Sequence, residues 1–288
     1  MEIKSRAKVN ITLDVVNKRD DGYHNIRMIM QTIDLYDVLY LEKIAHGIEL
    51  KTNLPYLPVN KKNIAYKAAR LFFDTLGIEN EGIRINIKKN IPVSAGLAGG
   101  STNAAAVLVA MNKMYGTGLK TEQLMEMGKK LGADVPYCIL GGTALAEGIG
   151  DVLTPLPPIP NMLMVLAKPP VSVSTASVYK QLNINTIMAR PDTEGVIHAI
   201  YNQDVKSIAK GMYNVLEEVT AKRHPVINTI KRIMLDSGAL GAIMSGSGPT
   251  VFGVFEDKVS ARKAVSRLEK VASDIFIVNT YNSNGRER

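Results

Sequence analysis

The sequence contains little cysteine, no tryptophan and no long apolar run, and each absence excludes a class of protein. Cys138 is the one cysteine in 288 residues, so the chain forms no internal disulfide bond. This cysteine and the four histidines show none of the spacings that metal sites require. No apolar run is long enough to span a bilayer, and residues 1–6 lead straight into a strand pattern rather than a signal peptide. We therefore expect a cytoplasmic protein without a membrane partner.

The balance of charge limits the class of partner. The chain has 35 Lys and Arg against 27 Asp and Glu, which gives a net charge of +8. Such an excess is typical of proteins that bind nucleic acid or a small polyanion. The basic residues are spread along the chain without a dense block, so we favour a small anionic substrate and expect no nucleic-acid partner. The length allows one large domain or two ordinary ones, and the oligomeric state stays open.

A glycine-rich stretch at residues 91–106 is the most informative part of the chain. The alternating segment 83–88 predicts a strand before it, and the alanine-rich run after it predicts a buried helix that ends at Gly116. Glycines let backbone N–H groups approach a ligand closely, and a helix start adds free N–H groups and a positive dipole end. The combination suits a phosphate. The alternative is an ordinary turn capped by Ser101 or Thr102.

Two common phosphate motifs are excluded in this stretch. A Walker loop needs a lysine directly before the hydroxyl residue, and none precedes Ser101 or Thr102. The dinucleotide fingerprint G-x-G-x-x-G is also absent from these residues. A nucleoside triphosphate would therefore bind here by another design.

The N-terminal segment alternates between apolar and polar residues, which predicts a strand at residues 3–15. Lys8 and Asn10 share its polar face, about 7 Å apart along the strand. Taken alone, the pattern favours an ordinary exposed strand face. Tyr23 and His24 follow a polar turn, and their spacing alone slightly favours a structural role over a binding role.

A proline-rich segment at residues 154–160 divides the chain, because four prolines cannot sit within a regular element. We place a domain junction there, with domains at residues 1–155 and 156–288. In the second domain, apolar strands flank a small-residue turn at residues 244–250, which predicts a hairpin. The other predicted elements are strands at 37–44, 48–51, 141–146, 162–167 and 274–281, and helices at 64–73, 122–131, 194–201, 205–217, 225–235 and 258–271, with a short one after Ser174. Asn63 is expected to cap the helix at 64–73, and Gly77 to end it.

Three stretches resemble the sequence motifs of the GHMP kinases, which include galactokinase, homoserine kinase, mevalonate kinase and phosphomevalonate kinase. Residues 92–104 resemble their P-x-x-x-G-L-G-S-S-A/N-A motif, residues 7–13 the first motif and residues 244–250 the third. The motifs follow in order and at compatible spacing along the whole chain. Three positions depart from the pattern, where family members often have glycine: Ser94, Ala95 and Ala98.

The resemblance implies an α+β fold of two domains, with mixed or antiparallel sheets, helices and an active site in the cleft between the domains. It implies ATP as the phosphoryl donor, with Mg²⁺. Residues 21–24 and 132–137 resemble the members whose acceptor is a cytidine-diphosphate-linked methylerythritol. Phosphorylation of its C2 hydroxyl would give the 2-phosphate and ADP, in non-mevalonate isoprenoid biosynthesis. Two alternatives stay open, a kinase of mevalonate or homoserine and a basic RNA-binding protein.

Asp134 precedes Val135 and Pro136, which by itself is typical of a helix N-cap with proline in the first turn. The resemblance implies instead that Asp134 is the base that takes the proton from the acceptor hydroxyl, and that Lys8 pairs with it. Ser101 or Thr102 would help to hold Mg²⁺. The residues expected at ATP are Pro92, Val93, Ser94, Ala95, Gly96, Leu97, Ala98, Gly99, Gly100, Ser101 and Thr102, with Asn63 and Lys89 near the adenine.

The acceptor site follows from the same resemblance. Tyr23 and Tyr179 would sandwich the cytosine, and His24 would read its edge, since stacking gives affinity and hydrogen bonds give selectivity. The residues expected at the acceptor are Asn10, Tyr23, His24, Tyr179, Ser245 and Gly246.

Overall fold

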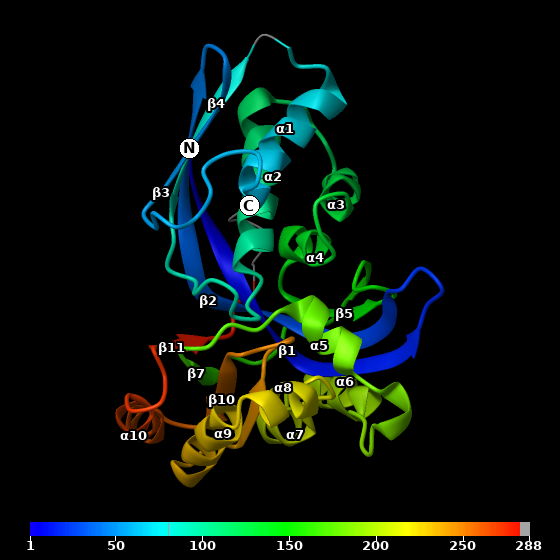
Figure 1. The fold of residues 1–288 in the computed structure, drawn as a ribbon, viewed down its shortest axis with the longest axis vertical. Helices are drawn as coiled ribbons and strands as arrows, with labels where there is room; N and C mark the ends of the chain where they lie inside the picture. Colours follow the sequence, from blue (N-terminus) through cyan, green and yellow to red (C-terminus); the bar gives the residue numbers. More distant parts are fainter. Residues whose placement is uncertain (80, 283–288) are drawn as a thin grey trace.

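Two lobes make up the fold, and a long β-hairpin lies between their helices (Figure 1). The computed structural model describes residues 1–79 and 81–282. Each lobe is a sheet with helices packed against it, so the α+β architecture expected from the sequence is confirmed. Among the described residues, no helix is both long enough and apolar enough to cross a membrane.

The hairpin consists of β1 (Glu2–Lys18) and β2 (His24–Ile44), which pair antiparallel along most of their length. Two of its three register shifts fall on either side of residues 8–10. A bulge bends a strand and redirects its side chains, so this short segment is set apart from the regular ladder at both ends. The strand expected at residues 3–15 is confirmed.

The sheet of the first lobe has the order β3-β4-β2-β1-β8, with β5 beside β2 and β6 beside β5. Its helices gather on one face, and α2 lies buried among them (Figure 1). This burial fits the nearly all-apolar pattern of that helix. The bounds are β3 Gly47–Thr52, β4 Gly82–Lys88, β5 Thr143–Glu147, β6 Val152–Pro155, α1 Ile64–Leu76, α2 Gly99–Tyr115, α3 Thr121–Lys129 and α4 Val135–Leu140.

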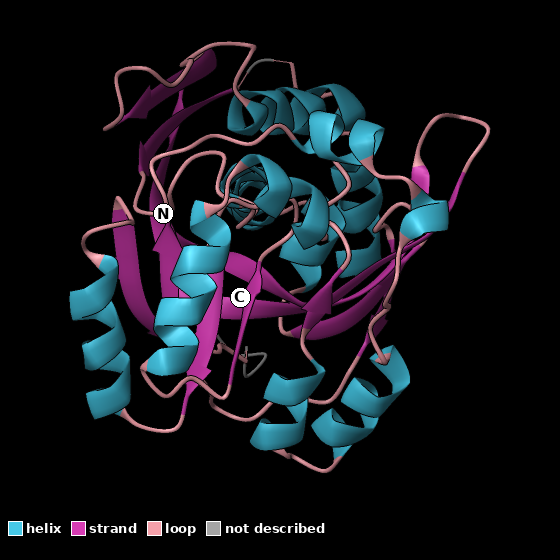
Figure 2. Ribbon diagram, turned by 60° about the horizontal axis from the view of Figure 1, so that its bottom comes forward, coloured by secondary structure: helices cyan, strands magenta, loops and turns pink. Residues whose placement is uncertain are grey.

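The second lobe has an antiparallel sheet of order β11-β7-β10-β9. Figure 2 shows the strands of both lobes through the middle of the molecule with helices on either side. The hairpin expected around residues 244–250 is confirmed by β9 and β10. The bounds are β7 Leu163–Lys168, β8 Tyr213–Asn214, β9 Gly241–Met244, β10 Val251–Phe255, β11 Asp274–Asn279, α5 Thr175–Gln181, a 3₁₀ turn Ile184–Thr186, α6 Thr193–Tyr201, α7 Val205–Gly211, α8 Glu217–Arg223, α9 Val226–Asp236 and α10 Lys258–Leu268.

One predicted helix, at residues 205–217, is wrong. α7 ends at Gly211, and β8 then pairs in parallel with β1. The buried side chain of Asn214 explains the break, because its amide donates to the carbonyls of Met244 and Gly246 at 2.8 and 2.7 Å. β8 also brings residues from the second half of the chain into the first sheet, and the division at residue 155 stays a prediction.

The expected strand at residues 37–44 is only the end of a longer one, because β2 begins at His24. Its first half is largely buried, so it lacks the clean alternation that marks a half-exposed strand. Lys8 and Asn10 are likewise more buried than the sequence pattern indicates. The two residues are 5% and 0% exposed, so the exposed polar strand face favoured by their spacing alone is wrong.

Candidate active site

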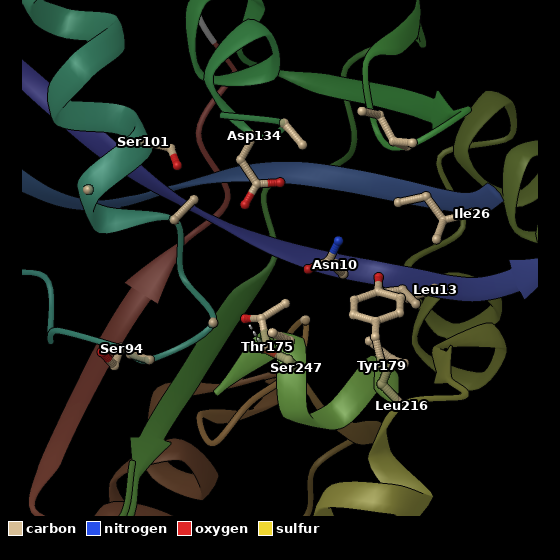
Figure 3. A pocket seen from close by; sticks show the side chains of 18 of the residues that line it. Asn10, Leu13, Ile26, Ser94, Ser101, Asp134, Thr175, Tyr179, Leu216 and Ser247 are labelled. Atoms are coloured by element: carbon tan, nitrogen blue, oxygen red, sulfur yellow. Dashed lines mark hydrogen bonds between the residues drawn. The ribbon is translucent and has the colours of Figure 1, made fainter. Parts of the chain in front are cut away.

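A cavity of about 1600 Å³ opens between the two lobes and takes side chains from both. The glycine-rich loop and the start of α2 form one end, β1 and the turn before α4 the centre, and α5 the other end (Figure 3). A single small-molecule site usually has about 300–1000 Å³. This cavity therefore has room for two ligands side by side.

The glycine-rich loop ends in the start of a helix that no side chain caps. α2 begins at Gly99, and its N-cap residue Ala98 has no side-chain cap bond. The alternative of a turn capped by Ser101 or Thr102 is therefore wrong. Ser101 lines the cavity, whereas Thr102 is buried in the helix. The first-turn N–H groups lack partners within a helix, and here they lie beside the cavity.

Two of the three departures from glycine occupy the backbone conformation that glycine favours. Ser94 has φ 52° and Ala98 has φ 57°, both in the left-handed region. Ala95 does not, and its side chain is buried in the core beside the loop. The loop thus keeps the turn geometry of a glycine-rich loop at a cost in backbone strain of about 1–2 kcal/mol per residue.

Replacing Ala98 by glycine is expected to stabilise the fold by up to about 1 kcal/mol, because glycine adopts this φ without strain and is the better N-cap residue. Ala95→Gly is the matched control, since it removes a buried methyl group and relieves no strain, and it should lower the free energy of unfolding by about 1 kcal/mol. Urea denaturation of both variants measures the difference. Equal destabilisation would show that position 98 is not strained.

The loop is bound to the turn between β9 and β10. The Ser245 hydroxyl donates to the Gly96 carbonyl at 3.0 Å, and the Thr250 N–H donates to the Ala95 carbonyl at 3.4 Å. A Cβ added to Gly96 would lie 2.3 Å from the Ser245 carbonyl oxygen. Gly96 therefore packs directly against the backbone of the turn from the second lobe. Ser245 and Leu97 are buried and do not line the cavity, and their contact with a ligand stays a prediction.

The centre of the cavity combines a buried ammonium group with a carboxylate. Lys8 Nζ donates to Asn10 Oδ1 at 2.8 Å and lies 3.9 Å from Asp134 Oδ2. Asp134 is the N-cap residue of α4, as expected, yet its side chain makes no cap bond and is 35% exposed. Figure 3 shows its carboxylate pointing into the cavity toward Asn10. The arrangement can take a proton from a ligand hydroxyl and stabilise the negative charge that develops.

Aromatic side chains form the end of the cavity away from the loop. The rings of His24 and Tyr179 lie 5.2 Å apart between centroids and are tilted by 32°, while Tyr23 is 61% exposed. Burial and the nearby Lys18 lower the pKa of His24 below its usual value, so its imidazole is neutral at pH 7. Burial raises the pKa of the Tyr179 phenol. This end can hold a flat, uncharged ring.

Positive charge dominates the described residues that line the cavity. Five are lysines, whereas Asp134 is the one carboxylate among them. Such a lining favours ligands that carry several phosphate charges. Ser247, in the turn between β9 and β10, lines the cavity as the resemblance implies for residues 245–248. Four further lining side chains carry no sequence signal that marks them as part of a site: Lys18, Lys62, Thr175 and Lys180.

Two residues expected near adenine line the cavity but have protein partners. Asn63 caps α1 by accepting from the Ala65 N–H at 2.9 Å, and its amide donates to Pro58. Lys89 is buried against the carboxylate of Asp37. Their contact with the nucleotide stays a prediction.

Comparison with known proteins places this geometry in a family. The N-terminal domain of the GHMP kinases matches residues 63–142, and their C-terminal domain matches residues 196–274. The chain is 53% identical to 4-diphosphocytidyl-2-C-methyl-D-erythritol kinase of Clostridium botulinum, over 97% of this chain and 100% of that protein. It is also 53% identical to the Clostridium perfringens enzyme of the same name, over 99% of each chain.

Solved structures agree with this assignment. A crystal structure of 4-(cytidine 5'-diphospho)-2C-methyl-D-erythritol kinase superimposes with a TM-score of 0.84 at 32% identity, over 98% of this chain and 100% of that one. Homoserine kinase from Cytophaga hutchinsonii has a TM-score of 0.77 at 22% identity, over 99% and 96% of the chains, and shares the fold. The chain therefore belongs to the GHMP kinases, in the family of the 4-diphosphocytidyl-2-C-methyl-D-erythritol kinases.

Proposed function

We propose that this chain transfers the γ-phosphoryl group of ATP to the C2 hydroxyl of 4-diphosphocytidyl-2-C-methyl-D-erythritol, which yields the 2-phosphate and ADP in non-mevalonate isoprenoid biosynthesis. One observation carries the proposal: a single cavity joins a helix start suited to phosphate, a Lys8–Asp134 centre and an aromatic end. Membership of the kinase family supports ATP as the donor. The names of its relatives at 53% identity support the acceptor.

The centre of the cavity would carry the chemistry. Asp134 would accept the proton of the C2 hydroxyl as its oxygen bonds to the γ-phosphorus and the bond to the ADP oxygen breaks. Lys8 would stabilise the negative charge on the reacting oxygens. Asn10 holds the Lys8 ammonium group by its hydrogen bond and would contact the acceptor.

Mg²⁺ would bind mainly through the phosphate oxygens of ATP. The described residues contain no group of three or more His, Cys, Asp or Glu that could hold a metal ion by themselves. The Ser101 hydroxyl points into the cavity (Figure 3) and fits as an additional oxygen donor. Bound there, the ion would neutralise phosphate charge.

The far end of the cavity supports a cytidine-bearing acceptor over mevalonate or homoserine. Those two acceptors have no ring to stack on Tyr23 or Tyr179, and they carry no diphosphate for Lys18 and Lys180 to neutralise. A nucleotide base gains about 1–3 kcal/mol from stacking on one aromatic ring. CMP should therefore compete with the acceptor and leave ATP binding unchanged.

Tyr179→Leu is expected to raise the acceptor KM by about 5- to 150-fold and to leave the ATP KM unchanged, because it removes one stacking surface but keeps an apolar side chain. Steady-state kinetics with each substrate varied in turn measure the two constants. Tyr201→Ala is a control, since that tyrosine is 63% exposed outside the cavity and should change neither. A rise in the ATP KM alone would place the acceptor elsewhere.

A further inference from the structure

A cluster of four buried polar residues lies beneath the glycine-rich loop and is distinct from the Lys8–Asp134 centre. Asp37 comes from β2, Lys89 follows β4, Asn103 is in the first turns of α2 and Ser5 is in β1. Their exposed fractions range from 0% for Asp37 to 8% for Lys89. Buried charges are costly unless they are paired and hydrogen-bonded. A buried cluster of this kind is therefore expected to have a structural or functional role.

The Asp37 carboxylate bonds to both ends of the loop at residues 92–98. Before the loop, its Oδ1 accepts from the N–H groups of Asn90 and Ile91 at 2.7 and 2.8 Å. After the loop, its Oδ2 accepts from the Asn103 amide at 2.8 Å. One side chain thus fixes the distance between the strand that enters the loop and the helix that leaves it.

Lys89 and Asn103 extend these bonds to neighbouring elements. Lys89 Nζ pairs with Asp37 Oδ2 and also donates to Asn103 Oδ1 at 3.1 Å and to the Gly99 carbonyl at 3.5 Å. The Asn103 amide donates its second hydrogen to the Ser5 hydroxyl at 2.9 Å. Since Ser5 lies on β1 three residues before Lys8, the cluster connects the loop to the strand that carries the proposed chemistry.

We propose that Asp37 is a positioning residue that holds the phosphate loop closed for ATP, with Lys89 as its counter-charge and Asn103 as its link to α2. The inference rests on the proposed function only in that ATP binds at this loop. Ser94 and Ala98 keep their left-handed backbone inside the segment that Asp37 closes. Strained conformations persist where surrounding bonds hold them, so loss of these bonds should let the loop relax and weaken ATP binding.

The test compares ATP affinity, by calorimetry with Mg-ATP, in two variants. Asp37→Asn together with Lys89→Met removes both charges without leaving either one unpaired, and it should weaken ATP binding at least tenfold. Asn103→Ala keeps the ion pair, removes the bonds of Asn103 to Asp37, Lys89 and Ser5, and should weaken ATP binding by about threefold. Lys89 also lines the cavity, so a loss in the double variant with unchanged ATP affinity in Asn103→Ala would assign the effect to contact of Lys89 with the nucleotide and overturn the proposal. In both variants the acceptor KM should stay within twofold of the wild-type value while the ATP KM rises.

Leu50→Ala is the control for general destabilisation, because Leu50 is buried in β3 away from the cavity. It should lower the Tm and leave ATP affinity unchanged. Wild-type ATP affinity in the charge-neutral double variant, or equal loss of ATP affinity in Leu50→Ala, would overturn the proposal. If the double variant does not fold, Asn103→Ala decides, and unchanged ATP affinity there overturns it. If the wild type binds ATP but does not phosphorylate the cytidylated acceptor, the proposed function fails and this comparison still applies.

Discussion

Asp134→Ala is expected to lower kcat by about 10²- to 10⁴-fold without lowering the Tm. Removal of a general base has an effect of this size, and the buried Lys8 ammonium group cannot take over proton removal. The fold should tolerate the change, because the Asp134 side chain makes no cap bond and is 35% exposed. Steady-state kinetics and thermal denaturation of the same preparation measure both quantities.

Asp204→Ala is the matched control, because Asp204 is also a helix N-cap residue but lies outside the cavity. Its carboxylate accepts from the Ser207 N–H at 3.1 Å, so its loss should cost about 0.5–2 kcal/mol of stability and leave kcat unchanged. The two variants should therefore show opposite effects. Full activity in Asp134→Ala would remove this residue from the mechanism, and a fall in Tm alone would assign it a structural role.

Gly96→Ala is expected to weaken Mg-ATP binding at least tenfold and to lower the free energy of unfolding by about 2–4 kcal/mol. The residue has φ 75°, and a Cβ would lie 2.3 Å from the backbone oxygen of Ser245. Strain at such a φ costs about 1–3 kcal/mol, and the clash adds to it because the backbone of the opposing turn cannot rotate away. The lobes would separate at the point where the loop meets the second turn.

Gly77→Ala measures the cost of a side chain at a left-handed φ without a steric clash, and so separates the two effects at Gly96. Gly77 ends α1 with φ 64°, but a Cβ there has no neighbour within 4 Å. This variant should cost about 1 kcal/mol and leave ATP affinity unchanged. Calorimetry and urea denaturation compare the two glycines. If Gly96→Ala cost no more than Gly77→Ala and bound ATP normally, the close contact between the lobes would not matter for the site.

Helix starts and ends that depend on residues close together in the chain could be predicted from the sequence. Asn63 and Gly77 begin and end α1 as expected, Ser174 caps α5, and Gly116 ends α2. Each depends on a bond within a few residues, so residue type and spacing suffice. The motif resemblance added the family, which the comparisons confirm.

The features that distant contacts determine could not be predicted. The break before β8 depends on the bonds from Asn214 to residues about 30 positions away. Lys8 and Asn10 are buried beside residues far away in the sequence, Asp134 before α4 and Gly246 in the turn between β9 and β10. Asp37, which lies 52 residues from Lys89 in sequence, showed no signal in the sequence, because no local pattern marks it.

Release of ADP by the purified wild-type chain is the most direct test of the proposed acceptor. Parallel reactions contain the chain and Mg-ATP with one acceptor each at equal concentration: 4-diphosphocytidyl-2-C-methyl-D-erythritol, mevalonate or homoserine. ADP release is expected with the cytidylated acceptor alone, matched by one new phosphate monoester for each ADP. Equal ADP release with mevalonate or homoserine, or none with the cytidylated acceptor, would contradict it.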